Sequence, residues 1–318
     1  MKTVLVTGAA GFIGSHLVRR LASGGTRVVA LYTGQHGTGR LCGIPGDLRL
    51  ERADLRQPES LEGLFAAYRF AEVFHLAAHG VHENDTDAAA MSETNTLGSF
   101  ALGRLALRHG VRRFIHCGSA LEFSLSGAPI TESFPLGANT LYGASKAAGW
   151  LLLDYLHRAE GLPLVTIRPF TVFGPGESGR KLIPGVIARA ARDEPVFLTS
   201  GTQVRDYIYI TDAVDALLLA AGEAATPGDS FNIGCGIGGA MPVRSLVETT
   251  LRLMKVSPSL CRFGEYQRTR PDPPFLVSNP AYARSRLGWS PRVSIEEGLI
   301  QTIRSVTRSQ QLAMAAVA

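Results

Sequence analysis

The chain has 318 residues, of which 45% are hydrophobic and 19% charged, and its formal net charge is +5. This length and composition are typical of a folded globular protein of one large domain or two, and exclude a disordered or fibrous chain. Lys and Arg are scattered without a basic block, so we expect a pocket for an anionic small molecule and no nucleic-acid partner.

Targeting and metal signals are missing from the sequence. The first strand follows Met1 directly and no apolar run is long enough to span a bilayer, which predicts a cytoplasmic protein with no membrane partner. The four cysteines stand far apart without CxxC spacing, so we expect free thiols and no metal site.

The segment KTVLVTGAAGFIG, from Lys2 to Gly14, is typical of a buried strand followed by a helix. Gly8 permits the tight turn between them, Gly11 allows a ligand to approach the backbone, and Gly14 allows the helix to pack on the sheet. Because the N–H groups at a helix start attract anions, this turn predicts a site for a dinucleotide pyrophosphate.

The second strand, predicted over 27–32, ends where dinucleotide folds meet the adenosine ribose. An Asp or Glu at this point selects NAD, but the chain has Tyr32. Thr33 and Arg40 in the following loop suit a ribose phosphate better, so the sequence favours NADP(H), with NAD(H) as the alternative. The simpler interpretation is that Tyr32 only packs and Arg40 is a solvated charge.

Strands are predicted over 48–53, 72–78 and 112–117, and helices over 58–68 and 88–109. Asp54, after the third strand, either accepts from the adenine amino group or caps the next helix. His79 and His82 follow the fourth strand, where substrate contact is favoured over a metal because no third ligand is evident. The alternation predicts a doubly wound parallel α/β sheet with its ligand crevice at the carboxyl ends of the strands.

Three polar residues form the candidate catalytic group. Tyr142 and Lys146 are four apart at the start of a helix predicted over 141–159, so they share one face. A nearby ammonium stabilises a phenolate and brings tyrosine, with its usual pKa of about 10, toward working pH. Ser119, at the end of the fifth strand, is placed to hydrogen-bond the same substrate oxygen.

Several ordered motifs carry a resemblance to a known family: TGAAGFIG, ADL (53–55), HLAA (75–78), the Ser119, Tyr142 and Lys146 triad, and RPFTVFGPG (168–176). The chain resembles the extended short-chain dehydrogenases/reductases that act on nucleotide sugars. The resemblance implies a Rossmann-type domain over 1–168 and a mainly substrate-binding, smaller C-terminal lobe over 169–308, with later segments returning to the first domain. Two helices, over 278–289 and 294–306, are expected to close the chain, and we expect residues 309–318 to form a frayed tail.

The resemblance and the motifs together assign the site residues. Cofactor contacts are expected from Gly8, Gly11, Phe12, Ile13, Gly14, Tyr32, Thr33, Arg40, Asp54, Leu55, Leu76, Ala77, Ala78, His79, Asn95, Cys117, Tyr142, Lys146, Pro169 and Val172. Substrate contacts are expected from His79, Ser119, Ala120, Thr171, Lys181, Arg205 and Arg270. Arg205, placed before a predicted strand, and Arg270 are assigned to the diphosphate of a nucleotide sugar, because a guanidinium offers two parallel donors.

The family also implies a homodimer, formed by pairing the helices around 88–109 and 141–159. Small residues such as Gly103 and Gly149 make close helix packing feasible there, although small residues also line ordinary cores.

Three reactions use this machinery: epimerisation, 4,6-dehydration and reduction of a keto sugar. Dehydratases carry an acidic pair directly after the catalytic hydroxyl residue, whereas here Ala120 and Leu121 precede Glu122, so dehydration is disfavoured. Epimerases usually keep the acidic residue that Tyr32 replaces. We therefore predict reduction at C4 of a nucleotide-linked 4-keto-6-deoxy sugar, with an NAD-dependent 4-epimerase as the alternative. A non-catalytic cofactor-binding module is disfavoured because Tyr142 and Lys146 are both present.

Overall fold

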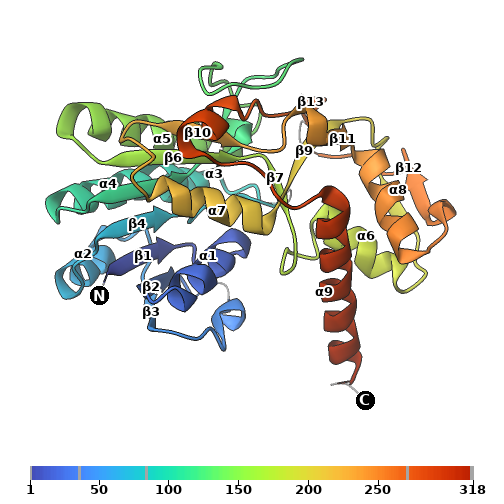
Figure 1. Cartoon of the computed structure of the whole chain (residues 1–318), viewed down its shortest axis with the longest axis horizontal. Helices are drawn as coiled ribbons and strands as arrows, with labels where there is room; N and C mark the ends of the chain where they lie inside the picture. The colour runs from blue at the N-terminus through green and yellow to red at the C-terminus, as the bar shows by residue number, and fades with distance from the viewer. Residues whose placement is uncertain (1, 35–36, 83–84, 270–271, 316–318) are drawn as a thin grey trace.

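The computed structural model describes residues 2–34, 37–82, 85–269 and 272–315 (Figure 1). Its centre is a seven-stranded sheet in the order β10-β6-β5-β4-β1-β2-β3, with every pair parallel. The strands are β1 (Thr3–Thr7), β2 (Arg27–Tyr32), β3 (Leu48–Arg52), β4 (Glu72–His75), β5 (Arg113–Cys117), β6 (Leu164–Pro169) and β10 (Ser230–Ile233). The strand order reverses between β1 and β4, which opens a crevice at their carboxyl ends. The Rossmann-type fold class predicted from the sequence is confirmed.

Helices cover both faces of this sheet. The helices α1 (Phe12–Ser23) and α7 (Ile210–Ala220) share one apolar core, and α2 (Pro58–Ala67), α4 (Ser99–Arg108) and α5 (Leu141–Glu160) share the other. Along β1, Val4 and Val6 point into the first core and Leu5 into the second. Strands buried on both faces explain why the sequence shows apolar runs without polar alternation.

The helix predicted over 88–109 has an irregular centre. It consists of α3 (Ala88–Met91), a π-helical segment η2 (Ser92–Gly98) and α4. A single π-helical turn is a frequent feature of functional sites, and this one contains the buried Asn95.

The chain leaves the central sheet after Pro169 and builds a smaller lobe, at the right of Figure 1. In this lobe β9 (Val204–Tyr209) pairs with β7 (Thr171–Phe173), β11 (Ala240–Pro242) and β13 (Phe275–Leu276), and β8 (Val196–Leu198) pairs with β12 (Cys261–Phe263). The helices α6 (Leu182–Ala190) and α8 (Val243–Met254) enclose a small core with Val186, Val247 and Leu251. The long helix α9 (Ile295–Ala315) packs against α6 and α8. Short helical turns complete the described chain: η1 (Gly39–Leu41), η3 (Ala120–Glu122), η4 (Ile237–Gly239), η5 (Pro258–Leu260) and η6 (Ala283–Leu287).

The structure corrects three sequence predictions in this region. Arg205 is the second residue of β9 and does not precede it. The helix predicted over 278–289 shortens to a turn around η6. Helix α9 continues past Ser309 to Ala315, where a frayed tail was expected, and Gln310 in this last part donates to the carbonyl oxygen of Ala188 on α6 at 3.0 Å.

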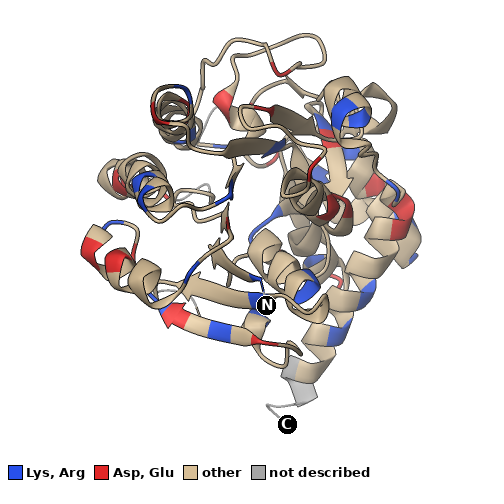
Figure 2. Ribbon diagram, turned by 60° about the vertical axis from the view of Figure 1, so that its left-hand side comes forward, with Lys and Arg blue, Asp and Glu red and all other residues tan. Residues whose placement is uncertain are grey.

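In Figure 2 basic and acidic positions are both spread over helices and strands. Across the described residues no helix combines the length and the apolar character needed to cross a bilayer.

Candidate active site

The glycine-rich turn between β1 and α1 brings backbone atoms unusually close together. Gly8 has φ +65°, and a Cβ on it would lie 2.7 Å from the amide nitrogen of Ala77. A Cβ on Gly14 would lie 2.2 Å from the carbonyl oxygen of Gly8. Gly11 precedes α1 without a side-chain cap, and Phe12 and Ile13 are half-buried at the first two helical positions. The uncapped helix start fits a pyrophosphate.

Near the end of β2, where the adenosine ribose is expected to bind, the structure places guanidinium groups. Tyr32 ends β2, half-buried against the core, and Thr33 after it is exposed. Arg40 donates to the carbonyl oxygens of Ala10, at 3.3 Å, and Gly176, at 3.1 Å. Arg52, the register partner of Tyr32, lies within 3.0 Å of the Cβ position of Gly34.

A cavity of about 290 Å³ lies beside Arg40. It is lined by Ser15, His16, Arg19, Gly39, Arg40, Cys42, Pro175 and Gly176. The Nε2 atom of His16 is 2.8 Å from the carbonyl oxygen of Pro175, so Nε2 carries the proton and donates. Burial lowers the pKa of His16, and the charges of Arg19 and Arg40 lower it further. With two guanidinium groups and no carboxylate among its lining residues, the cavity suits an anion.

Asp54 does not cap the next helix as one interpretation predicted. Its carboxylate accepts from Arg56 through Nε, at 3.1 Å, and through the terminal nitrogen, at 2.6 Å, and this pairing lowers the pKa of Asp54. Leu55 beside it is buried, 3% exposed. Helix α2 begins after Gln57 with no side-chain cap.

A directed chain of hydrogen bonds supports the backbone after β4. The N–H of Ala77 donates to Thr7 Oγ1 at 3.2 Å, and Thr7 Oγ1 lies 2.8 Å from His75 Nδ1. His75 Nε2 lies 2.8 Å from Ser99 Oγ, which donates to the carbonyl oxygen of Asn95. Since the Ser99 proton is used there, His75 donates from Nε2 and accepts at Nδ1. Leu76, Ala77 and Ala78 lie beyond β4, half-buried, where backbone can face a ligand.

Asn95 holds the backbone of the loop after β4 at His79. It has no exposed surface, its Oδ1 accepts the N–H of His79 at 2.8 Å, and its Nδ2 donates to the carbonyl oxygen of His79 and to Ser145 Oγ. Both N–H groups of its amide are therefore used within the protein, where they hold the His79 backbone and Ser145 in place. The His79 side chain is half-buried at the loop.

The structure brings the three candidate catalytic residues together at the carboxyl edge of β5. Thr140 caps α5 by accepting the N–H of Gly143 at 3.0 Å, which places Tyr142 and Lys146 one turn apart on the inner face. The Tyr142 hydroxyl hydrogen-bonds Ser119. Lys146, 1% exposed, donates to the carbonyl oxygen of Cys117 at 2.8 Å.

Burial is the main influence on both titrating groups. It raises the pKa of Tyr142 well above its usual value, and the hydrogen bond with Ser119 opposes this rise. Burial lowers the pKa of Lys146. Lys146 was expected to lower the tyrosine pKa, whereas in the structure the group that lowers the pKa of Tyr142 is Ser119.

Sequence reasoning missed the buried ion pair behind Ser119. Glu122 Oε1 accepts the Ser119 N–H at 2.7 Å, and Oε2 accepts from Arg168 Nε at 2.6 Å. Both side chains are at most 2% exposed, and the guanidinium stacks 4.5 Å from the centre of the Trp150 ring. The spacing Ser119-x-x-Glu122 is a capping box and was the available signal.

The expected substrate residues are only partly assembled. Lys181 Nζ donates to the carbonyl oxygen of Val81 at 2.8 Å and so links the two lobes across the crevice. Arg205 is 8% exposed and paired with Asp272. Thr171, Val172 and Pro169 are half-buried near the point where the chain changes sheets. Arg270 lies outside the described residues.

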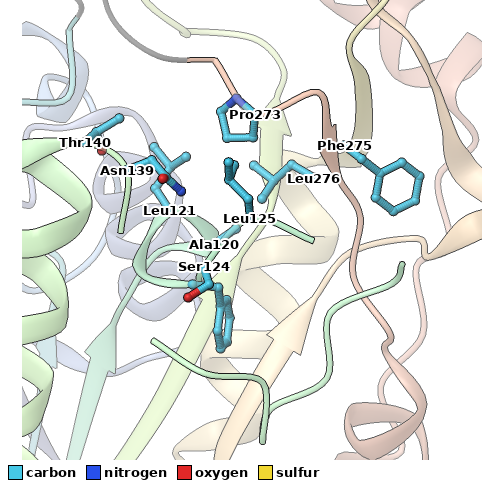
Figure 3. A pocket seen from close by; sticks show the side chains of 10 residues that line it. Ala120, Leu121, Ser124, Leu125, Asn139, Thr140, Pro273, Phe275 and Leu276 are labelled. Atoms are coloured by element: carbon cyan, nitrogen blue, oxygen red, sulfur yellow. The ribbon is translucent and has the colours of Figure 1, made fainter. Parts of the chain in front are cut away.

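A small apolar pocket adjoins the turn after Ser119 (Figure 3). It is lined by Ala120, Leu121, Phe123, Ser124, Leu125, Asn139, Thr140, Pro273, Phe275 and Leu276. Leu121 and Leu125 face Pro273 and Leu276 there, so the segment before β13 packs on the turn that holds Ser119. In the described part of the chain no three His, Cys, Asp or Glu residues are grouped as metal ligands would be.

This fold and this arrangement define a dinucleotide-binding enzyme of the Rossmann type. Residues 4–234 match the NAD dependent epimerase/dehydratase family, and the chain belongs to that family. It is 31% identical to a UDP-glucose 4-epimerase of Mycolicibacterium smegmatis, over 96% of this chain and 99% of the relative. The resemblance to extended short-chain dehydrogenases/reductases that act on nucleotide sugars is thereby confirmed.

Solved structures show the same similarity. The UDP-glucose 4-epimerase of Thermotoga maritima, solved with UDP-glucose, has a TM-score of 0.88 and 27% identity, covering 97% of this chain and 99% of its own. The dTDP-glucose 4,6-dehydratase of Streptomyces venezuelae, solved with NAD, has a TM-score of 0.88 and 28% identity, covering 98% of both chains.

Proposed function

We propose that this protein reduces the C4 keto group of a nucleotide-diphosphate 4-keto-6-deoxy sugar by hydride transfer. The observation that carries the proposal is the contact between Tyr142 and Ser119, with the buried Lys146 bonded to the end of β5 beside them, at the carboxyl edge of a dinucleotide-binding sheet. Two hydroxyl groups that meet at one point can hydrogen-bond the same substrate oxygen.

Each of these residues has a defined part in the reaction. A reduced nicotinamide, when bound, supplies the hydride. Ser119 and Tyr142 donate to the carbonyl oxygen, which develops negative charge, and Tyr142 passes its proton to the new alkoxide. Lys146 keeps a positive charge beside the tyrosine and orients the cofactor ribose. The high pKa of Tyr142 in its buried site keeps the hydroxyl protonated before the reaction, as a general acid requires.

The basic cavity favours NADP(H) over NAD(H). The 2′-phosphate distinguishes the two cofactors, and Tyr32 leaves no carboxylate at the end of β2 to repel it. Arg40 contacts the glycine-rich turn through Ala10 and lines the cavity together with Arg19. This supports an exchangeable reductant, as a reductase needs.

The ion pair of Glu122 disfavours the dehydratase reaction. A 4,6-dehydratase needs a carboxyl group that exchanges protons with the substrate, but Glu122 is fully buried and occupied by Ser119 and Arg168. Glu122 instead fixes the position of Ser119 by accepting its backbone N–H.

A 4-epimerase with retained NAD is the second candidate. The specific observation in its favour is the 31% identity with a UDP-glucose 4-epimerase over 96% of this chain. The same Tyr142 would then remove the C4 hydroxyl proton and later return one after the sugar presents its other face.

For the substrate, we propose a nucleotide diphosphate held in the crevice between the lobes, with the sugar toward His79, Ser119, Ala120 and Thr171. Lys181 and Arg205 stand on the lobe side, although Arg205 must share its charge with Asp272.

The first test is to purify the protein, denature it and quantify the released cofactor. Exchangeable NADP(H) or an empty site supports the reductase, and 4-keto sugar nucleotides are then screened by loss of reduced-cofactor absorbance. Tightly held NAD near one equivalent contradicts the reductase and supports the epimerase.

A second test replaces the general acid. We expect Tyr142→Phe to lower kcat by about 10²–10⁴-fold, the usual range for acid–base catalysis, with cofactor affinity nearly unchanged. The matched control is Tyr282→Phe, which removes a hydroxyl that bonds Asp229 outside the candidate active site and is 37% exposed. Near-normal turnover of Tyr142→Phe contradicts the proposed role.

A further inference from the structure

A row of polar side chains crosses the buried centre of the sheet. Thr7 on β1 is the register partner of His75 on β4, which pairs with His116 on β5, which pairs with Thr166 on β6. Register partners point to the same face, and all four residues have no exposed surface. Strands buried on both faces are normally apolar, so a polar row here requires an explanation.

The hydrogen-bond chain from Ala77 to Asn95 explains why Thr7 and His75 are polar although they are buried. His116 is different, because its Nε2 lies 3.3 Å from the Nζ of Lys146. An ammonium group has only donors, so the contact requires a lone pair on Nε2 and places the imidazole proton on Nδ1. Within the described residues Nδ1 has no hydrogen-bond partner.

We propose that His116 is a positioning residue for Lys146: its Nε2 lone pair and the Cys117 carbonyl oxygen hold the ammonium at two points and direct its third N–H toward the ligand. The inference rests on the proposed function, in which Lys146 acts as a cation beside Tyr142. A buried ammonium needs such acceptors because burial alone favours its neutral form.

His116 does not relay protons in this arrangement. A relay would need a partner on Nδ1, and none is found in the described part of the chain. The groups that face His116 also oppose its protonation: Lys146 from α5, His75 from β4 and Arg168 from β6 add to burial in lowering its pKa. The Glu122 carboxylate instead favours the charged form of Lys146. The imidazole therefore stays neutral, which leaves its Nε2 lone pair available to Lys146.

The kinetic test compares His116→Phe with His116→Gln. Phenylalanine removes the acceptor, so Lys146 loses its proton more easily and the alkaline limb of the kcat profile moves to lower pH by about one unit. At neutral pH we expect kcat to fall about 10- to 100-fold, the range for a hydrogen bond to a charged group. Glutamine offers a carbonyl oxygen at similar reach. His116→Gln should therefore keep most of the native kcat and most of the native position of the alkaline limb.

The matched control is Thr166→Val, since Thr166 neighbours His116 in the row and its hydroxyl is unpartnered among the described residues. This nearly isosteric change should leave the alkaline limb in place. A role limited to packing would lower kcat in His116→Phe without moving the limb. An unmoved limb, or equal effects of Phe and Gln, overturns the proposal.

A spectroscopic test needs no turnover and no variant. Nitrogen-15 spectra of histidine-labelled protein should show His116 as the neutral Nδ1–H tautomer between pH 6 and 8, and His75 as the Nε2–H tautomer. An Nε2–H tautomer or an imidazolium at His116 overturns the proposal. If no keto sugar is turned over but the Nδ1–H tautomer is found, the proposed function has failed and the His116–Lys146 contact stands.

Discussion

At the scale of single residues, His75 shows how much this site depends on a neutral imidazole. It accepts from Thr7 at Nδ1 and donates to Ser99 from Nε2, so a second proton would break the Thr7 bond. Burial, with Lys146, lowers the pKa of His75 to about 3. The backbone of Ala77, expected at the cofactor, is held by this chain.

The sign of the resulting pH dependence follows from the lowered pKa. In the unfolded chain His75 binds a proton below about pH 6.5, whereas in the folded protein it does so only near pH 3. Its stabilisation is therefore complete above pH 6.5 and is lost as the pH falls from 6.5 toward 3, up to roughly 5 kcal/mol at 1.36 kcal/mol per pKa unit. Burial also lowers the pKa of His116, so this residue likewise contributes stability that is lost as the pH falls.

We expect the thermal unfolding midpoint to decrease steeply between pH 6 and 4, and to decrease less in His75→Asn, which removes the titrating group. The measurement is calorimetry from pH 4 to 8. The exposed His109 is the control, since its replacement by Asn should leave the slope unchanged. A flat profile for the native protein contradicts the assignment.

At the scale of elements, the π-helical segment η2 and helix α5 approach each other through glycine. A Cβ on Gly149 of α5 would lie 2.1 Å from the carbonyl oxygen of Asn95, and a Cβ on Gly103 of α4 would lie 2.8 Å from Leu153. The small residues considered for a dimer contact thus serve packing within the chain. They bring Asn95 close enough to bond Ser145 on α5.

Gly149→Ala should therefore destabilise the protein, by about 1–3 kcal/mol as overpacking does, because the methyl group meets backbone that cannot move aside. Gly63→Ala is the matched control. It lies exposed in helix α2 with nothing near its Cβ position, and it should stabilise by about 0.5–1 kcal/mol. Urea unfolding of both variants measures the difference, and equal stabilities would contradict the close approach.

The same elements show what the sequence can and cannot predict. The strands, the glycine turn and the Tyr142–Lys146 spacing follow from local periodicity and composition, which act over a few residues. The contact of Glu122 with Arg168 joins residues 46 apart, and that of Lys146 with His116 joins residues 30 apart. Such partners are set by sheet order and register, so no local pattern indicates them. The pairing of Arg205 with Asp272 was missed for the same reason.

At the scale of the whole molecule, the outer face of η2 and α5 presents large apolar side chains. Leu97 is 59% exposed, and Leu151 and Tyr155, four residues apart on α5, are 51% and 53% exposed. Residues at this spacing share one helix face, and an apolar face of this kind is typical of an interface. The face is consistent with the homodimer that the family resemblance implies, in which two such helix pairs would form a four-helix bundle.

The double substitution Leu151→Arg with Tyr155→Arg should dissociate that dimer. In an isologous interface the two arginines of each protomer would face the arginines of the other protomer. The cost of burying these like charges would not be offset by any opposite charge. Light scattering after gel filtration should give twice 34.0 kDa for the native protein and 34.0 kDa for the variant. Leu312→Arg on α9, where Leu312 is 63% exposed, is the matched control and should leave the mass unchanged. A native mass of 34.0 kDa, or a dimer that survives the double substitution, would show that this face is not the interface. Because Tyr142 and Lys146 stand on the same helix as Leu151 and Tyr155, we also expect the dissociated variant to lose part of its turnover while retaining the glycine-turn cofactor site.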